Sequence, residues 1–225
     1  MAAKDGSGKS AAAPAAARGP GSARGAIREE LRAFRKDRIL YEAAELFYER
    51  GYAGTTLDAI AERLEVTKPF IYYYCRNKLE LLVDICDRML DLTMDAVTRS
   101  LAVEGTPGER LEAFVRNFVR TQIENQRLVG VFFREERSLP DEMRRRIDAV
   151  RGEFDEKLAE ILDEGVAAGA FDIDDTRLAS LAIGGMMAWT FTWYMPGGRL
   201  EVDDICDRMV PLVERMVRPA GSGGG

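Results

Sequence analysis

The sequence contains no histidine, and this absence argues against several kinds of enzyme. Histidine is a common zinc ligand, the usual partner of a catalytic serine or cysteine, and the commonest general base. A helical enzyme that uses paired carboxylates for acid–base chemistry remains an alternative. We therefore expect a protein that is not an enzyme and that binds no metal or cofactor.

Cysteine is scarce and long hydrophobic runs are missing. The three cysteines, Cys75, Cys86 and Cys206, form an odd set without the spacing of a metal site or a redox motif, so we expect reduced thiols. No apolar run approaches the roughly 18 residues needed to span a bilayer, and the first residues do not read as a secretion signal. These absences predict a cytoplasmic protein that does not enter a membrane.

Positive charge is also in short supply, because the net charge at pH 7 is −6. The deficit is uneven along the chain. Residues 1–78 carry 14 Lys and Arg against 10 Asp and Glu, a balance of +4, whereas residues 79–225 carry 18 against 28, a balance of −10. A basic first part and an acidic second part suit one module that contacts DNA phosphates and another that DNA repels.

Apolar residues follow helical spacing from residue 26 onward, and no segment alternates for long enough to form a strand. The expected fold class is therefore all-α. The first helix should be long, because one apolar stripe runs through Ile27, Leu31, Phe34, Ile39, Ala43, Leu46 and Phe47 before it stops at Gly51.

Composition and periodicity divide the chain into four segments. Residues 1–25 and 219–225 are rich in Ala, Gly, Ser and Pro, which predicts flexible tails. Residues 26–78 should form a small helical DNA-binding domain. Residues 79–218 should form a larger helical domain for ligand binding and dimerisation.

Two short helices inside the first domain carry the functional signal. Thr56 precedes an amphipathic helix that ends at Leu64, and Thr67 opens another that ends at Tyr74 and has Pro69 in its first turn. A tight connection at Glu65-Val66 joins them. This arrangement predicts a helix-turn-helix, in which the second helix enters the major groove of double-stranded DNA and the first crosses the backbone.

We assign the DNA contacts to the helix starts and to the exposed face of the second helix. Helix N-termini and lysines suit phosphates, and Phe70 suits a thymine methyl group. The three consecutive tyrosines cannot share one helical face, so we expect Tyr72 to pack inward. The candidate DNA-binding residues are Thr55, Thr56, Thr67, Lys68, Pro69, Phe70, Tyr73, Tyr74 and Lys78.

This stretch resembles the DNA-binding signature of the TetR repressor family. The resemblance implies a three-helix DNA-binding domain, a helical ligand domain, and a homodimer that leaves its palindromic operator when an inducer binds. Two positions depart from the family pattern, because Glu65 replaces a small residue and Tyr74-Cys75 replaces a His-Phe pair. The matching residues are Arg38-Ile39-Leu40, Ala43-Ala44, Leu46-Phe47, Gly51-Tyr52, Thr55-Thr56, Ile60-Ala61, Val66, Ile71-Tyr72-Tyr73, Lys78 and Leu81.

The helix expected at residues 178–194 is apolar around nearly its whole circumference. A helix of this kind is buried on more than one side, so we expect it to contact both its own domain and a second subunit. Gly184 and Gly185 would allow another helix to approach closely.

Large aromatic side chains and a methionine suit an adaptable apolar pocket. The region from Trp193 to Leu200 is weakly similar to TetR-type repressors that respond to acyl-CoA thioesters of lipid or steroid catabolism. We therefore expect a small apolar effector, with a long-chain or polycyclic acyl-CoA as the leading candidate and Arg134 or Arg137 near its phosphates. The candidate ligand-binding residues are Phe114, Phe118, Phe132, Phe133, Met186, Trp189 and Trp193.

A multidrug-sensing repressor of an efflux gene is the principal alternative within the same fold. A carboxylate that faces the aromatic residues, such as Glu135, would favour it.

Overall fold

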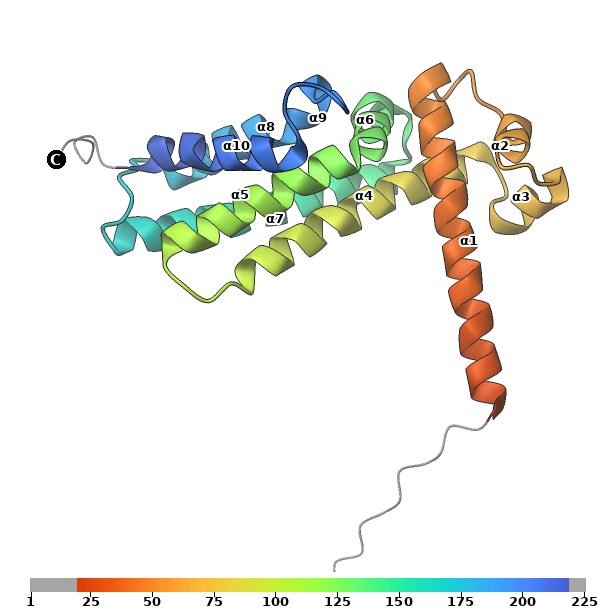
Figure 1. Ribbon diagram of the computed structural model, residues 1–225, viewed down its shortest axis with the longest axis horizontal. Helices are drawn as coiled ribbons and strands as arrows, with labels where there is room; N and C mark the ends of the chain where they lie inside the picture. Colours follow the sequence, from red (N-terminus) through yellow and green to blue (C-terminus); the bar gives the residue numbers. More distant parts are fainter. Residues whose placement is uncertain (1–19, 219–225) are drawn as a thin grey trace, which may run out of the picture. The chain divides into compact units, whose positions relative to one another are not determined.

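The computed structural model describes residues 20–218, and every regular element in that range is a helix (Figure 1). The all-α expectation is confirmed. The elements are α1 (Pro20–Arg50), α2 (Leu57–Arg63), α3 (Lys68–Tyr74), α4 (Lys78–Leu101), α5 (Pro107–Glu124), α6 (Gln126–Glu135), the 3₁₀ turn η1 (Glu136–Ser138), α7 (Asp141–Ala167), α8 (Thr176–Ala188), α9 (Thr190–Trp193) and α10 (Val202–Val217).

Side-chain caps explain where several helices begin. The Thr56 hydroxyl accepts a hydrogen bond from the Ala59 N–H at 3.1 Å, and this bond starts α2. Thr106 and Glu109 form the expected capping box at the start of α5. Asn77 and Asp175 cap α4 and α8 in the same way as Thr56 caps α2.

Helix α1 starts at Pro20, which is earlier than the expected start at residue 26. The expected flexible tails otherwise lie outside the described residues. The predicted single apolar stripe along α1 is wrong. Ile27, Leu31 and Phe34 are exposed, whereas the residues from Ile39 onward that continue the pattern are buried. At about 100° per residue, these two apolar sets point to opposite sides of one helix.

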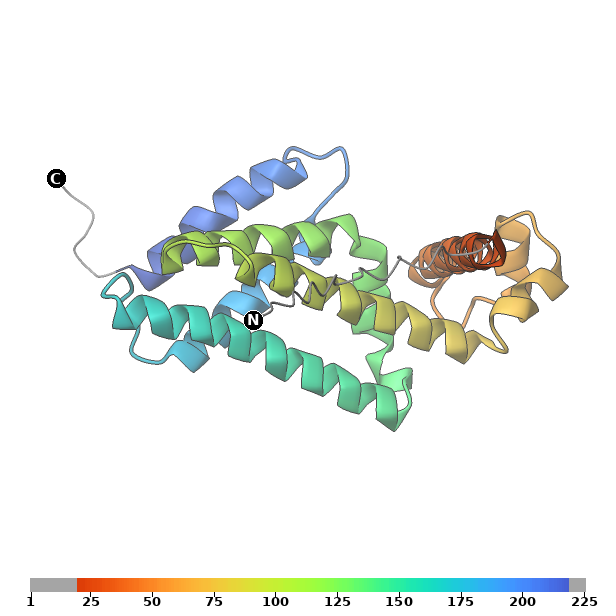
Figure 2. The same ribbon diagram turned by 90° about the horizontal axis from the view of Figure 1, so that it is seen from below.

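Residues 20–38 and 39–218 belong to separate compact units, and the second contains the core. Within it, α5 lies between α4 and α10, and α7 packs on α8 (Figure 2). One hydrophobic cluster joins α2, α3, α4 and the end of α1 to Leu128, Val129 and Phe132 of α6. Packing therefore continues across residue 78, where the sequence suggested a domain boundary.

The apolar segment expected as one helix at residues 178–194 is divided. Trp189 ends α8, and α9 begins at Thr190 as a single turn. Trp189 lies at the junction of the two helices and Trp193 ends α9, and both side chains are exposed. None of the helices between residues 20 and 218 is both long and apolar enough to cross a membrane.

A candidate DNA interface and an apolar cavity

Helices α2 and α3 form the expected helix-turn-helix. Ile60 of α2 and Ile71 of α3 are fully buried in the shared core and hold the pair together. Glu65 in the turn has a φ of 55°, a left-handed conformation that favours glycine. The Thr67 side chain makes no capping bond at the start of α3. Its hydroxyl therefore keeps its hydrogen-bonding capacity for a ligand.

The leading turn of α3 is exposed at Thr67, Lys68 and Pro69. Lys68 forms an ion pair with Asp58 of α2, and this hydrogen bond raises the pKa of the lysine. The pair links the two helices across the same surface. Phe70 differs from expectation, because it is half-buried and packs on the core with its ring centroid 5.1 Å from that of Tyr74.

The arrangement of the tyrosines corrects the sequence prediction. Tyr72 and Tyr73 are 53% and 69% exposed, whereas Tyr74 is half-buried against the core. Ile71 and Cys75, four residues apart, define the inner face of α3, and Tyr74 lies beside them. That spacing was the signal that could have placed Tyr72 outside. Tyr72 therefore lies with Tyr73 on the exposed face of α3, and Tyr74 does not belong to that face.

Thr55 and Lys78 also have roles inside the protein. Thr55 is fully buried, and its hydroxyl donates to the Gly51 carbonyl at 2.9 Å. The Lys78 ammonium donates to the carbonyls of Tyr52 at 2.6 Å and Thr55 at 2.9 Å, and it lies 4.3 Å from the centre of the Tyr52 ring. Both residues fix the loop between α1 and α2. Thr55 has no exposed surface, so the expectation that it contacts DNA is wrong. Lys78 is only partly buried, and its contact with DNA stays a prediction.

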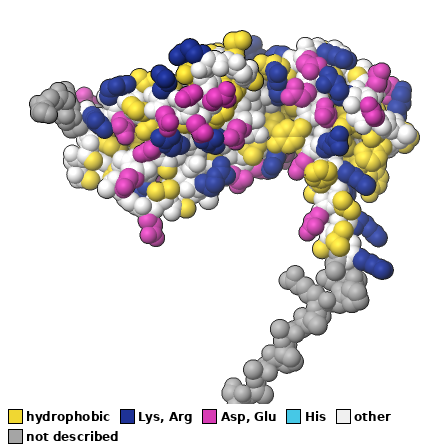
Figure 3. All heavy atoms as spheres, in the orientation of Figure 1, with side chains coloured by type: hydrophobic (Ala, Val, Ile, Leu, Met, Phe, Trp, Pro, Cys, Tyr) yellow, Lys and Arg dark blue, Asp and Glu magenta, His cyan; other side chains and the backbone are white. Residues whose placement is uncertain are grey.

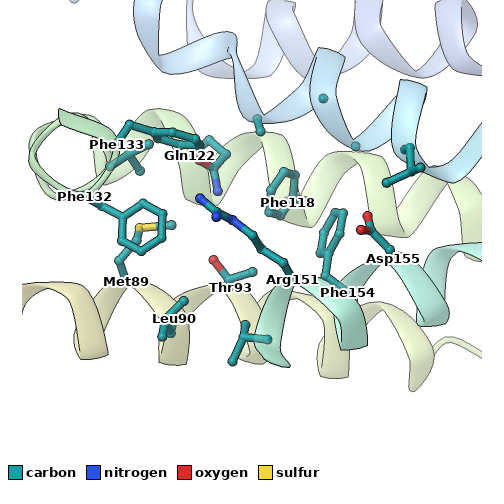
Figure 4. Close-up of a pocket in the computed structure, with 16 residues that line it drawn as sticks. Met89, Leu90, Thr93, Phe118, Gln122, Phe132, Phe133, Arg151, Phe154 and Asp155 are labelled. Atoms are coloured by element: carbon teal, nitrogen blue, oxygen red, sulfur yellow. The ribbon is translucent and has the colours of Figure 1, made fainter. Parts of the chain in front are cut away.

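A cavity of about 300 Å³ lies among the five helices α4 to α8 (Figure 4). Phe118, Phe132, Phe133 and Phe154 surround it, and Thr93, Gln122 and Arg151 point toward its interior. Its remaining walls come from Met89, Leu90, Val129, Val150, Asp155, Leu181, Gly184, Gly185 and Ala188.

The cavity is mostly apolar, so its few polar groups matter for recognition. Gln122 is only 3% exposed and makes no hydrogen bond to any residue in the range 20–218. Arg151 forms a two-bond ion pair with Glu136, at 2.8 and 2.7 Å. Burial raises the pKa of the Asp155 carboxyl, and Arg151 partly opposes that shift.

The structure brings together only part of the predicted ligand-binding set. Phe118, Phe132 and Phe133 line the cavity, as expected. Phe114 lies instead in the core beside Phe154, with ring centroids 5.2 Å apart. The other three expected residues do not line the cavity: Met186 packs on the core, and Trp189 and Trp193 are 58% and 47% exposed.

Sequence reasoning missed the contributions of α4 and α7, and on α8 it selected Met186 rather than the residues that line the cavity. Met89, Leu90 and Thr93 share one face of α4, and Leu181, Gly184 and Ala188 share one face of α8. Gly184 permits the close approach that its sequence suggested, because a Cβ there would lie 3.1 Å from Phe154. Gly185 has open space instead. Helical spacing was the available signal, but the sequence did not show which faces meet.

Helix α6 contacts both the cavity and the end of α1. Phe132 and Phe133 line the cavity, while Arg134 donates to the carbonyls of Phe47 and Tyr48. Gly130 lies against the Tyr48 ring, where a Cβ would come within 2.4 Å of the ring. Arg134 is thus engaged with α1, which leaves Arg137 as the exposed candidate for effector phosphates.

Two family models match this chain. "Bacterial regulatory proteins, tetR family" matches residues 39–85, and "Tetracyclin repressor-like, C-terminal domain" matches residues 104–217. The chain belongs to the TetR family. As a TetR-family protein it is a DNA-binding transcriptional regulator and not an enzyme. The family's DNA-binding region begins at residue 39, so the helical segment before that residue lies outside the match.

Individual TetR-family proteins resemble this one over most of their length. The transcriptional repressor KstR2 of Mycolicibacterium smegmatis is 27% identical over 80% of this chain and 89% of its own. The regulator PfmR of Thermus thermophilus is 31% identical, with a TM-score of 0.73 over 79% of this chain and 97% of its own. AibR, solved with isovaleryl coenzyme A and operator DNA, is 30% identical, with a TM-score of 0.69 over 79% and 97%.

Proposed function

We propose that this TetR-family protein is a homodimeric repressor that binds palindromic operator DNA and releases it when an acyl-CoA thioester enters the α4–α8 cavity. Gln122 is the observation that carries the choice of effector. Gln122 is only 3% exposed and its side chain points into the cavity, so its amide is positioned to donate to a carbonyl such as that of a thioester. Repression of transcription in the cytoplasm is part of the same proposal.

The exposed start of α3 supports the DNA-binding role. Thr67, Lys68, Tyr72 and Tyr73 present hydroxyls, an ammonium group and aromatic rings on one surface. These groups suit phosphates and base edges in a major groove. Thr56 and Pro69 flank this surface and keep their predicted places at the helix starts.

The volume of the cavity supports an effector with a modest acyl group. At about 300 Å³, the cavity lies at the small end of the range for ligand pockets, which is roughly 300–1,000 Å³. A short or medium acyl chain fits this space better than the long-chain or polycyclic groups that the sequence suggested. The isovaleryl coenzyme A bound to the similar protein AibR belongs to that size class.

An alternative effector is a cationic drug, and Asp155 is the observation that favours it. Its carboxyl lines the cavity, and burial disfavours its charged form. A cationic ligand would pair with the carboxylate and so offset the cost of burying that charge. Glu135, the carboxylate that the sequence suggested, does not line the cavity.

A substitution that fills the cavity and lies away from the exposed face of α3 tests the proposal. Thr93→Phe adds a ring inside the cavity and should raise the acyl-CoA concentration for half-release of DNA by tenfold or more, equivalent to about 1.4 kcal/mol. Thr98→Phe, on the exposed side of the same helix, is the matched control and should respond normally. Equal responses of the two variants would exclude this cavity as the effector site.

A panel of effectors distinguishes the two candidates. DNA release should occur with short and medium acyl-CoA thioesters and should weaken with the free acids, with palmitoyl-CoA and with cationic dyes. Gln122→Leu should reduce release by acyl-CoA without reducing operator affinity, because only the carbonyl contact is removed. Release by dyes alone, lost in Asp155→Asn, would assign the protein to the drug-sensing alternative.

A further inference from the structure

The segment of α1 before the family fold carries an apolar stripe without a partner. Ile27, Leu31 and Phe34 are 55%, 50% and 66% exposed. Hydrophobic and basic side chains are visible along this part of the helix (Figure 3). The segment adds several turns to a DNA-binding region that starts at residue 39 in the family. Its exposed apolar side chains are therefore not needed to complete that fold.

The spacing of the stripe is that of a two-stranded coiled coil. Ile27, Leu31 and Phe34 follow each other at intervals of four and three residues, as d, a and d positions of a heptad do. Arg24 and Arg38 occupy the next a positions on either side and end the apolar seam. The seam is thus only three layers long, so it needs two chains that are already held together.

The charges beside the seam specify the orientation of the partner. Position g is acidic in Glu30 and position e is basic in Arg28 and Arg35. In a parallel pair, g contacts e of the other helix five residues later, which places Glu30 beside Arg35 of the second copy. In an antiparallel pair, g meets g and e meets e, so like charges would face each other. Neither Glu30 nor Arg35 forms an ion pair within residues 20–218.

We propose that the 24–38 segments of two copies of this protein pair in parallel through Ile27, Leu31 and Phe34, with Glu30 of each copy bonded to Arg35 of the other. A parallel pair satisfies the two-fold symmetry of a homodimer, because identical surfaces meet. The paired helices add a contact to the assembly that the family domains alone do not contain. The proposal is independent of the effector and of the cavity.

Disulfide cross-linking of the full-length protein tests the pairing. Ile27→Cys and Phe34→Cys each place a thiol in the seam, and Glu29→Cys places one on the opposite side of the same helix. The native thiols give little background, because Cys75, Cys86 and Cys206 are buried and burial raises the pKa of Cys86 to about 12. Both seam variants should form roughly tenfold more cross-linked dimer under mild oxidation than Glu29→Cys.

A charge swap tests the orientation in the Phe34→Cys background. Glu30→Arg alone and Arg35→Glu alone should each lower the cross-linked fraction, and the double swap should restore it. Helix content by circular dichroism shows that each variant is folded. Equal cross-linking at residues 27, 29 and 34, or a double swap without rescue, would overturn the proposal. Lower operator affinity and a shallower salt slope in Arg35→Glu, without any seam-specific cross-linking, would assign the segment to DNA phosphates instead.

Discussion

Glu65 stores strain in the turn between the two DNA-binding helices. Its φ of 55° costs a residue with a Cβ roughly 1–2 kcal/mol. A glycine avoids this cost, but its unfolded chain has more conformational entropy to lose on folding, so its net advantage is smaller. The residue is also exposed beside the DNA-reading face, where its carboxylate would repel phosphates. Strain and charge are therefore combined in one side chain, and two substitutions separate them.

Glu65→Gly should raise the free energy of unfolding by about 0.5–1 kcal/mol, because the left-handed conformation suits glycine. Glu65→Ala removes the charge but keeps the Cβ, so it should bring no such gain. Both variants should bind operator DNA more tightly, and by a similar factor. Thermal unfolding and a DNA titration at fixed salt measure the two effects. A stability gain in both variants would mean that charge rather than backbone conformation is responsible.

Lys78 illustrates a cation that stabilises a loop. Because its ammonium donates to the carbonyls of Tyr52 and Thr55, Lys78→Ala should destabilise the protein by about 1.5–3 kcal/mol. The slope of operator affinity against salt should not change, since no phosphate contact is lost. Lys68→Ala, on the exposed turn, should show the reverse pattern. A shallower dependence of operator affinity on salt in Lys78→Ala would show that Lys78 contacts a DNA phosphate.

At the scale of elements, α6 is positioned to couple the cavity to the DNA-binding helices. Gly130→Ala should force the Tyr48 ring away, because the added Cβ would lie 2.4 Å from it. We expect a loss of about 1–3 kcal/mol in stability and weaker operator binding. Gly152→Ala is the matched control, because nothing lies within 4 Å of its added Cβ. This control should stabilise α7 by up to about 1 kcal/mol and leave DNA binding unchanged.

Sequence patterns predicted the elements better than the surfaces on which they meet. The capping box of Thr106 and Glu109 is a local signal, and it placed the start of α5 correctly. Periodicity predicted one helix over residues 178–194, whereas α8 ends at Ala188, so the expected ligand set ran past that end to Trp193. Gln122 was missed for a related reason, since a single polar residue on an amphipathic helix does not reveal that its neighbours leave a cavity.

For the whole molecule, the proposed recognition of a palindromic operator depends on dimerisation, and we propose α8 as the dimer surface. Leu178 and Leu181 are 64% and 55% exposed on this helix, and they form an apolar strip that a second subunit could cover. A two-fold dimer would place its two reading helices roughly 35 Å apart, which matches successive major grooves of a palindrome. Leu181 also lines the cavity, so a contact at this strip would reach the effector site.

Leu178→Glu should therefore convert the dimer to a monomer at micromolar concentration, because burying two carboxylates opposite each other is costly. Operator affinity should fall steeply, since a monomer contacts only one half-site. Leu101→Glu, at the end of α4, also replaces an exposed leucine and should remain dimeric. Sedimentation velocity and DNA titration provide the two measurements. A Leu178→Glu variant that still sediments as a dimer would remove α8 from the interface.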